Sequence, residues 1–429
     1  MKIVWKSKLG KFEEGVIVVG AGPTGALLSY LLAKAGVQTT LIERHQDFSR
    51  EFRGEVLMPG GCLNLEQIGL GPDFENVPHV CMHEFKVYIN RRPAISLSMK
   101  GNGYDKYPPK WISQPHFLEM LVSKSAEYEN FRLLRGVKVR DLINKDGRII
   151  GVTADTGIKR ERIFGNLVIG ADGRSSITRA RSGIVAKQDP TPMDIVWIKI
   201  PQLENANNVT FNAYVGGGHI VFCAGTYDGQ IQIGFVIKKG TYKDLRDLGV
   251  AKLLALISEF VHPELARHIL NISTEEIKPF LLSTVSDRVE NWHLPGLLLL
   301  GDAAHTASPV GAQGINLGIR DAIVAANHLI PILSKPSNLN DIDAVLEAIE
   351  KERLSEIKSI QRIQALPPKL VLKNTWYSKL ILSLISTFSR NKTILAPING
   401  PFAKFAWGIS EVSWNNSQEA KTNAPNSLD

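Results

Sequence analysis

A glycine-rich turn near the N-terminus, Gly20-Ala21-Gly22-Pro23-Thr24-Gly25, carries the clearest chemical signal in the chain. In this G-x-G-x-x-G spacing, Gly20 permits a tight turn, Gly22 lets the backbone approach a pyrophosphate, and Gly25 allows a helix to pack closely on its sheet. Glu43 follows about 20 residues later, where a carboxylate can accept hydrogen bonds from ribose hydroxyls. The spacing predicts binding of an adenine dinucleotide, without distinguishing FAD from NAD.

The residues around this turn predict the elements that must position it. Residues 15–19 (GVIVV) are apolar throughout, which is typical of a strand buried on both faces of a parallel sheet. Residues 23–35 show the apolar spacing of a helix, and Gly36 stands where a helix C-cap is expected. A second strand over residues 37–42 completes a βαβ unit. The start of its helix would offer N–H groups to the phosphates.

Two later segments repeat the pattern of an apolar strand that runs into Gly-Asp. The first is Leu167–Gly173 and the second is Leu297–Asp302. We expect them to be neighbouring strands of one sheet. Asp302 would end its strand with a carboxylate free to accept hydrogen bonds, whereas Asp172-Gly173 is by itself also a common turn.

A third glycine-containing loop, Pro309-Val310-Gly311-Ala312-Gln313-Gly314-Ile315-Asn316, follows the second Gly-Asp. It leads into a predicted helix with one apolar face, formed by Ile315, Ile319, Ile323 and Ile330. The N-terminus of that helix could stabilise negative charge through its dipole and its backbone N–H groups.

In this order, the motifs resemble the p-hydroxybenzoate hydroxylase-like (class A) family of FAD-dependent monooxygenases. The resemblance rests on Gly20–Gly25, Gly170–Gly173, Gly301–His305 and Pro309–Asn316, and covers roughly residues 15 to 330. The last hundred or so residues carry no motif of the family.

The resemblance implies roles for further residues. Asp302 would contact the ribityl chain of FAD, Pro309 would pack beside the isoalloxazine ring, and the loop with Gly311, Gly314 and Asn316 would lie at the pyrimidine edge. Asp172 and Gly173 would lie near the pyrophosphate and have been linked with the nicotinamide nucleotide. His305 would be structural rather than catalytic.

Three polar residues outside these motifs are also candidates for FAD binding. Arg53, in Arg53-Gly54-Glu55-Val56-Leu57, is similar to a family arginine that contacts the diphosphate, and Gln114 to a glutamine that reaches the ribityl chain. Arg44 follows Glu43 and could stack on adenine or be a solvated surface charge. The less favoured alternative for Gln114 is an exposed polar loop residue.

The family's chemistry is implied in the same way. NADPH or NADH would reduce the flavin, O2 would form a C4a-hydroperoxide, and its distal oxygen would pass to an aromatic or otherwise electron-rich small molecule, with a lipophilic compound among the options. Rival hypotheses are a flavin-dependent halogenase, a prenyl reductase on the same fold, or a non-catalytic flavoprotein. Against the first, Val196–Pro201 has one tryptophan where halogenases carry Trp-x-Trp-x-Ile-Pro; against the second, His305 stands where prenyl reductases have glycine.

The middle of the chain predicts a different architecture. β-rich runs occupy residues 194–201, 209–215, 219–224 and 230–238, with a hairpin turn at Asp228-Gly229. Residues 85–90 and 94–99 form another predicted hairpin, joined through Arg91–Pro93. Together these runs predict one inserted, mostly antiparallel sheet. The inner face of this sheet would roof the flavin, with Trp197, Tyr214, His219 and Phe222 as candidate substrate contacts or as core residues.

The fold class is therefore α/β. We expect a Rossmann-like, glutathione-reductase-type FAD-binding domain with a parallel sheet, an inserted and mostly antiparallel substrate-binding sheet, and a helical C-terminal region. The predicted ranges are 1–75, 101–185 and 281–335 for the first domain, 76–100 and 186–280 for the second, and 336–429 for the third, which ends in a polar tail.

The C-terminal region contains an ambiguous segment over residues 367–408. Its apolar run Leu380–Ile385 is flanked by Lys369, Lys373, Lys379 and Arg390. One interpretation is an amphipathic surface that meets a membrane or a lipophilic substrate. The other is a set of helices that cap the substrate pocket or the sheet.

Composition narrows the function classes. The 429 residues are 44% hydrophobic, which suits large cores, and the net charge of +8 is dispersed without a dense basic run, so no nucleic acid is expected. The three cysteines, Cys62, Cys81 and Cys223, are widely spaced and predict neither a disulfide framework nor a metal site. A cytoplasmic enzyme is expected, with peripheral membrane contact as a weaker alternative, and the oligomeric state is not predicted.

Overall fold

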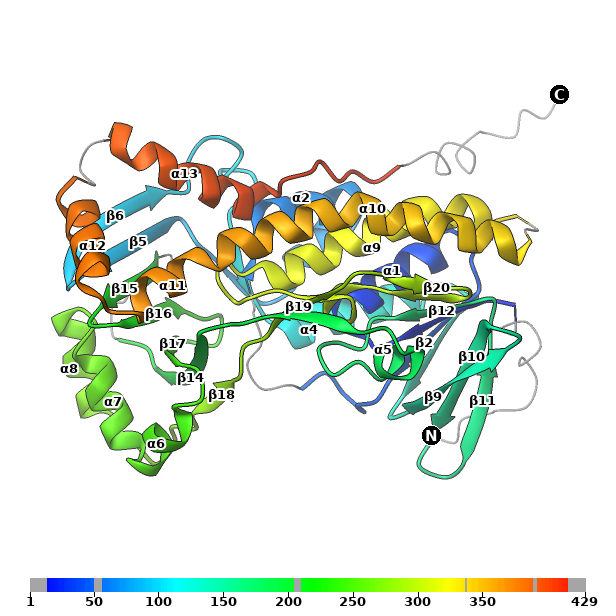
Figure 1. The fold of residues 1–429 in the computed structure, drawn as a ribbon, viewed down its shortest axis with the longest axis horizontal. Helices are drawn as coiled ribbons and strands as arrows, with labels where there is room; N and C mark the ends of the chain where they lie inside the picture. The colour runs from blue at the N-terminus through cyan, green and yellow to red at the C-terminus, as the bar shows by residue number, and fades with distance from the viewer. Residues whose placement is uncertain (1–13, 50–55, 204–209, 336–337, 389–391, 416–429) are drawn as a thin grey trace.

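A computed structural model describes residues 14–49, 56–203, 210–335, 338–388 and 392–415. In it, the chain forms two sheet-based regions side by side, and the long helices α9 (Gln313–Leu333) and α10 (Leu339–Gln364) lie along the region that contains β12 (Leu167–Gly170) and β20 (His293–Leu294) (Figure 1). The candidate Arg53 lies outside the described residues.

The first region is built on a six-stranded sheet in the order β20-β21-β12-β1-β2-β8. Its strands are β1 (Val16–Val19), β2 (Thr39–Glu43), β8 (Phe131–Arg135), β12 (Leu167–Gly170), β20 (His293–Leu294) and β21 (Leu297–Leu299). All pairs are parallel except β20–β21 at the edge. Val168 pairs with Leu297 and Gly170 with Leu299, so the two Gly-Asp segments end neighbouring strands, as predicted.

Helices and a small sheet cover this core. Its helices include α1 (Pro23–Lys34), α4 (Gln114–Ser125), α5 (Ile177–Ser182) and α9 (Gln313–Leu333). α1 ends at Ala35 with Gly36 directly beyond it, at φ +81°. A three-stranded meander, which the sequence patterns did not predict, consists of β9 (Lys138–Lys145), β10 (Arg148–Asp155) and β11 (Arg160–Phe164).

The second region is a seven-stranded sheet in the order β18-β14-β17-β16-β15-β5-β6. Its strands are β5 (Glu84–Ile89), β6 (Arg92–Ser98), β14 (Met193–Pro201), β15 (Thr210–Gly216), β16 (His219–Gly225), β17 (Gln230–Lys238) and β18 (Phe280–Leu282). Neighbouring strands are antiparallel except β15 and β5, so the sheet is mostly antiparallel. The predicted domain boundary at residue 281 falls inside β18.

The hairpin between β5 and β6 turns earlier than predicted. Asn90 and Arg91 have φ of 48° and 64°, the backbone of a two-residue turn that matches strand twist. The expected turn at Arg91–Pro93 is therefore wrong, and Pro93 pairs with Tyr88 within β6. Proline is tolerated there because β6 is an edge strand.

Helices cover one face of this second sheet. They are α6 (Tyr242–Asp247), α7 (Val250–Ser258) and α8 (Pro263–Asn271), and they pack on a core that includes Ile233 and Phe235. Two small sheets lie between the regions, formed by β3 (Val56–Leu57), β7 (Lys110–Ile112) and β4 (His79–Cys81), and by β13 (Ala186–Asp189), β19 (Ser286–Val289) and β22 (His305–Thr306). Two further helices are α2 (Pro59–Gln67) and α3 (Gly71–Glu75).

The C-terminal region is helical, as expected. α10 (Leu339–Gln364) begins with a capping box between Asn338 and Asp341, and it packs along α9. It is followed by α11 (Leu366–Leu372), α12 (Trp376–Phe388) and α13 (Lys392–Trp407). Among the described residues, no helix has the length and apolar character needed to cross a bilayer.

Candidate active site

The glycine turn after β1 is sterically demanding at two of its three glycines. Gly20 has φ +99°, and a Cβ there would lie 2.5 Å from the carbonyl oxygen of Ala171. A Cβ on Gly25 would lie 2.0 Å from the oxygen of Gly20. Gly22 differs, because no protein atom lies within 4 Å of its Cβ position, which opens into a cavity.

Glu43, the last residue of β2, secures this turn. It is 3% exposed, and its Oε2 accepts a hydrogen bond from the Ala21 N–H at 2.9 Å. Its Oε1 accepts from the His45 N–H at 3.0 Å. Arg44 is exposed and lines the cavity, and its Nε donates to His45 Nε2 at 3.0 Å. Glu43 thus lies beside the glycine turn, where the sequence placed it.

The Asp172 carboxylate lines the cavity and is also used by its own loop. It accepts hydrogen bonds from the N–H groups of Ile177 and Thr178, at 2.7 and 3.0 Å, and from the hydroxyls of Ser176 and Thr178, at 2.6 and 2.7 Å. It therefore caps α5. Gly173, at φ +82° and with open space around its Cβ position, lines the cavity beside it.

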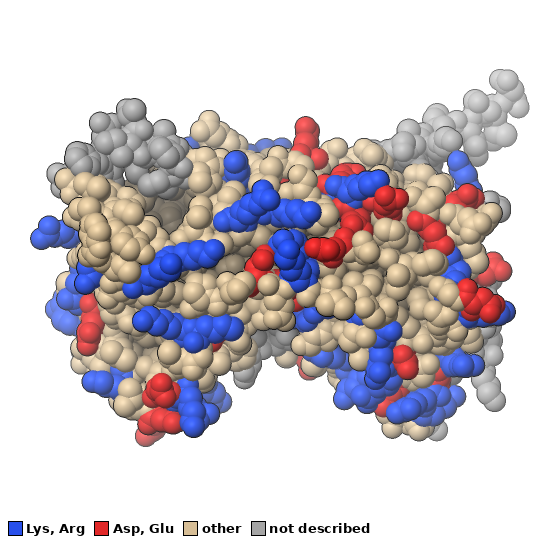
Figure 2. Space-filling view, in the orientation of Figure 1, with Lys and Arg blue, Asp and Glu red and all other residues tan. Residues whose placement is uncertain are grey.

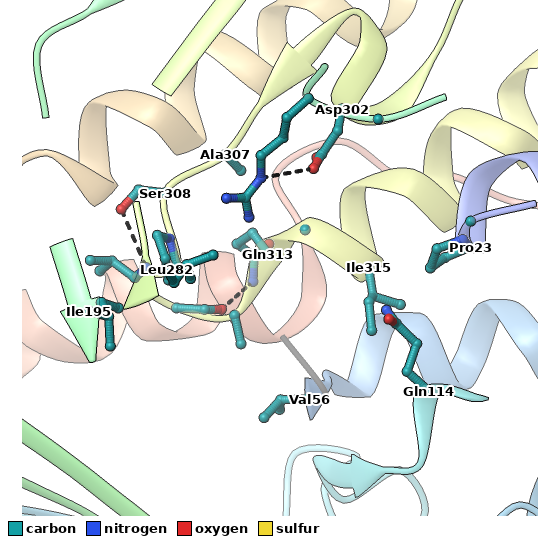
Figure 3. Close-up of a pocket in the computed structure, with 18 of the residues that line it drawn as sticks. Pro23, Val56, Gln114, Ile195, Leu282, Asp302, Ala307, Ser308, Gln313 and Ile315 are labelled. Atoms are coloured by element: carbon teal, nitrogen blue, oxygen red, sulfur yellow. Dashed lines mark hydrogen bonds and ion pairs between the residues drawn. The ribbon is translucent and has the colours of Figure 1, made fainter. Parts of the chain in front are cut away.

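Asp302 lies in a short 3-10 turn, η2 (Gly301–Ala303), directly after β21. Its Oδ2 pairs with Arg174 Nε at 3.4 Å, and the two side chains are about one-third exposed in the cavity wall. Figure 3 shows this pair at one side of the cavity. The carboxylate accordingly lines the cavity, and Arg174 is a neighbour that the sequence did not reveal.

The loop before α9 places a helix start at the cavity. Gly311 has φ +73° and Ala312 has φ +52°, an uncommon conformation for alanine. Gln313 Nε2 donates to the carbonyls of Gly311 and Phe405, at 2.7 and 2.9 Å. Gly314 lines the cavity with open space at its Cβ position, and Pro309 lines the same wall. N–H groups at a helix start have no partner within the helix.

Asn316 does not belong to the cavity wall, which corrects its predicted cofactor contact. It is 4% exposed, its Oδ1 accepts from the Met58 N–H at 2.8 Å, and its Nδ2 donates to the carbonyls of Val56 and Ala312, at 3.1 and 2.8 Å. The amide thus ties β3 to the start of α9. Being one residue beyond Ile315, it points to a different side of the helix.

Gln114 is a buried cavity residue rather than an exposed loop residue. It is 7% exposed at the start of α4, and its side chain points toward Ile315 in Figure 3. No described residue hydrogen-bonds to its side-chain amide, so the amide is available for hydrogen bonds to a ligand in the cavity.

These residues line one end of a cavity of about 1670 Å³. That volume exceeds the 300–1,000 Å³ or so of ordinary small-molecule pockets, and it leaves room for a dinucleotide and a second molecule. At the other end the wall is the inner face of the seven-stranded sheet. Figure 3 shows Ile195 and Leu282 of that sheet across the cavity from Pro23 and Gln114.

The sheet end of the cavity is aromatic. Phe211 stacks with Phe85 and Trp111 at centroid distances of 5.3 and 6.1 Å and meets Phe222 at 5.8 Å. The rings that line the cavity are Phe85, Trp111, Trp197, Phe211, Phe222, Phe280, Phe402 and Phe405. Such a surface suits an apolar, ring-containing ligand.

Only two of the four predicted substrate contacts face the cavity. Trp197 and Phe222 line it, whereas Tyr214 stacks on Tyr88 at 4.8 Å within the core under α7 and α8. His219 lies between Phe235 and Phe260, at 5.1 and 5.0 Å, and burial lowers its pKa. Tyr214 and His219 are therefore core residues on the opposite face of the sheet.

The C-terminal helices, which lack a family motif, also build the site. Phe405 of α13 packs on the Gly311 loop, since a Cβ on Gly311 would come within 2.6 Å of its ring. Leu366 and Leu370 of α11, Ile381 of α12 and Phe402 of α13 line the cavity. Helices that cap the substrate pocket were one of the two interpretations of residues 367–408. Sequence periodicity could not choose between them, because it shows that a helix is apolar, not what its apolar face covers.

The residues at the glycine end of this cavity are suited to binding FAD. The Cβ positions of Gly22, Gly173 and Gly314 open into the cavity, so side chains there would fill space that a ligand can use. The starts of α1 and α9 both line the cavity and have no side-chain cap, so the N–H groups of their first turns are available to the phosphates and the flavin of FAD. These features come from three distant segments that the parallel sheet brings together.

Comparisons with known proteins also indicate that the chain binds FAD. Residues 13–357 match the family described as an FAD binding domain. The 6-methylpretetramide 4-monooxygenase of Streptomyces rimosus is 30% identical over 83% of this chain and 84% of its own length. Two solved structures share the fold: p-nitrophenol 4-monooxygenase PnpA from Pseudomonas putida and PqsL from Pseudomonas aeruginosa.

The structural likeness extends over most of the chain. PnpA superposes with a TM-score of 0.74 at 18% identity, covering 92% of this chain and 98% of PnpA. PqsL superposes with a TM-score of 0.73 at 20% identity, covering 86% of this chain and 99% of PqsL. The chain belongs to the FAD-binding family of class A flavin monooxygenases that its motifs resemble, and it is an FAD-dependent oxidoreductase.

Proposed function

We propose that this enzyme uses NADPH or NADH, FAD and O2 to place one oxygen atom on an apolar aromatic or otherwise electron-rich small molecule. The observation that carries the proposal is the single cavity, which joins the glycine turns at one end to an aromatic sheet face at the other. The relative from Streptomyces rimosus, named for monooxygenation of 6-methylpretetramide, supports the same reaction class.

The chain's own residues would bind and orient FAD and the substrate. FAD, when bound and reduced, supplies the oxygen-activating chemistry. Gly20–Gly25 and the start of α1 would hold its diphosphate, Asp302 and Gln114 its ribityl chain, and the start of α9 its flavin end. The rings of Trp197, Phe211 and Phe222 would hold the substrate against that end and exclude water, which otherwise diverts activated oxygen.

One polar group marks the sheet end of the cavity. Gln232 lies on β17 beside Ala224, is 2% exposed, and lines the cavity. Its side-chain oxygen has no hydrogen-bond partner among the described residues. A buried acceptor without a partner is costly unless a ligand satisfies it. We therefore assign Gln232 the role of accepting a hydrogen bond from a substrate hydroxyl or N–H.

The test is substrate-stimulated oxidation of NADPH and NADH by the FAD-loaded enzyme, screened over phenolic, quinone-precursor and terpenoid compounds. We expect one class to accelerate oxidation together with O2 uptake, and a reaction under ¹⁸O2 to leave one labelled oxygen in the product. A requirement for separately supplied reduced flavin and halide would indicate a halogenase. Turnover without O2 would indicate a reductase, and no acceleration by any compound would favour a non-catalytic flavoprotein.

A further inference from the structure

Helix α12 is rich in apolar residues yet contributes little to the core. Trp376 is 77% exposed, Leu380 is 50% exposed and Leu384 is 47% exposed. None of the described apolar side chains of α12 is fully buried; the buried residue is Ser378. Leu366 of the preceding helix adds a side chain that is 66% exposed. An exposed apolar patch of this kind marks a contact surface.

The other side of the same helix faces the cavity. Ile381, Leu382 and Ile385 line it, and α12 packs on the β5–β6 hairpin at the end of the molecule (Figure 1). At this point, therefore, α12 alone separates the apolar part of the cavity from the exterior.

The segment of the chain that contains α12 carries charge of a single sign. Residues 357–410 contain eight Lys and Arg and neither Asp nor Glu, which equals the entire net charge of +8. Lys369, Lys373 and Lys379 are exposed, and no described carboxylate lies within ion-pair distance of them. Figure 2 shows the uncharged surface at this end of the molecule bordered by blue basic side chains.

We propose that α12 and Leu366 form a docking surface for an anionic lipid bilayer. The helix has 13 residues and is about 20 Å long, too short to cross an apolar layer of about 30 Å, so it would lie along the interface. Tryptophan and tyrosine favour that depth, and lysines beside it attract anionic headgroups. A second copy of this chain is a poor occupant, because it would bring the same positive charge onto the patch.

If the proposed function holds, the position of α12 also suggests how a substrate enters the cavity. A lipophilic substrate dissolved in the bilayer would need to pass only α12 to reach the aromatic end of the cavity. Docking itself does not depend on turnover, so vesicle binding tests the surface even where the catalytic proposal fails.

The experiment is co-sedimentation of the full-length, FAD-loaded protein with vesicles of phosphatidylcholine alone or mixed equally with phosphatidylglycerol. We expect binding to the anionic vesicles that weakens with salt. The triple variant Trp376→Ser, Leu380→Ser, Leu384→Ser should lose at least tenfold in affinity. Each of Lys369→Gln, Lys373→Gln and Lys379→Gln should weaken binding about fivefold.

The matched control replaces exposed apolar residues far from α12, Ile158 at 94% and Val185 at 82% exposure, with serine. It should bind like the unaltered protein, and unchanged FAD absorbance in every variant would show that the fold is intact. No vesicle binding by the unaltered protein, or equal loss in the control, would overturn the proposal. The proposal would also be overturned if the unaltered protein were a dimer, the triple variant were a monomer, and neither of them bound vesicles.

Discussion

At the scale of single residues, the glycine turn separates structural from functional glycines. A Cβ on Gly25 would lie 2.0 Å from the carbonyl oxygen of Gly20, so any side chain there must distort the turn, whereas a Cβ on Gly22 would meet no protein atom within 4 Å. We expect Gly22→Leu to fold with a free energy of unfolding like that of the cofactor-free protein, yet to lose FAD, because its side chain occupies the diphosphate position. Visible absorbance of the purified protein and FAD titration would measure this.

The control is Gly71→Ala, since a Cβ on Gly71 makes only ordinary contacts of 3.5 Å and longer. It should keep both stability and FAD. If Gly22→Leu still bound FAD with normal affinity, the cofactor could not lie along this turn.

Gln232 allows a second test at this scale. Gln232→Leu keeps the size of the side chain and removes the acceptor, and we expect KM for the substrate to rise roughly tenfold, as for the loss of one neutral hydrogen bond. A substrate analogue without the donor group should show no such difference between the two proteins. If the ratio of the two KM values, for substrate and for analogue, were the same in Gln232→Leu as in the unaltered protein, the assigned role would be ruled out. The control is Tyr214→Phe, on the other face of the sheet.

At the scale of elements, a buried ionic cluster fastens α9 and α10 to the turn that carries Asp302. Asp321 and Arg353 are fully buried and pair at 2.7 Å, and Arg353 also pairs with Glu356. Asp321 accepts hydrogen bonds from His305 Nε2 at 2.7 Å and from the Gly301 N–H at 3.1 Å. The cluster thus positions the residue before Asp302.

Two carboxylates make this cluster sensitive to acid. Burial alone would raise the pKa of Asp321 and Glu356, but the charges of His305 and Arg353 beside Asp321, and of Arg353 and Arg320 beside Glu356, lower both pKa values to about 2. Because the folded-state pKa lies below the unfolded value of about 4, the stabilisation is complete above about pH 4. It is lost as pH falls through about 2.

Arg353→Met should therefore destabilise the protein strongly. It removes one of the cations beside each of two buried carboxylates, which costs about 3–5 kcal/mol. The loss should be smaller near pH 4 than at pH 7, because the carboxylates would then take up protons more readily in the folded protein than in the unfolded chain. Urea unfolding at pH 7 and near pH 4 would measure both effects. Arg135→Met, which breaks the partly exposed pair with Glu119, should cost at most about 1 kcal/mol, and equal losses in the two variants would contradict the role of the cluster.

At the scale of the whole molecule, the sequence predicts what local patterns encode. The apolar runs Val16–Val19, Leu167–Gly170 and Leu297–Leu299 could be recognised as buried parallel strands because all their residues are apolar. The Gly-Asp ends of the last two then had to lie near the first glycine turn. The predicted parallel sheet, the mostly antiparallel second sheet and the helical C-terminal region follow from such patterns.

What the sequence could not predict depends on distant packing. Alternation shows that Trp197 and Phe222 point to one of two faces, but only the position of α7 and α8 decides that Tyr214 and His219 lie on the other. Likewise, the amide of Asn316 binds Val56 and Met58, some 260 residues away in the sequence. The Asn90-Arg91 turn was missed because arginine rarely adopts positive φ.

The dependence of the site on three remote segments leads to a prediction for the whole chain. Since Gly20–Thr24, Asp172–Arg174 and Gly311–Ile315 line one cavity, adding FAD to the cofactor-free protein should slow amide hydrogen exchange in all three segments together. The tip of the meander at Asp146-Gly147 lies outside the cavity wall and should exchange at the same rate in both forms. Protection confined to the first segment would mean that the dinucleotide does not extend to α9, and the cavity would then hold FAD in a different orientation from the one its glycines define.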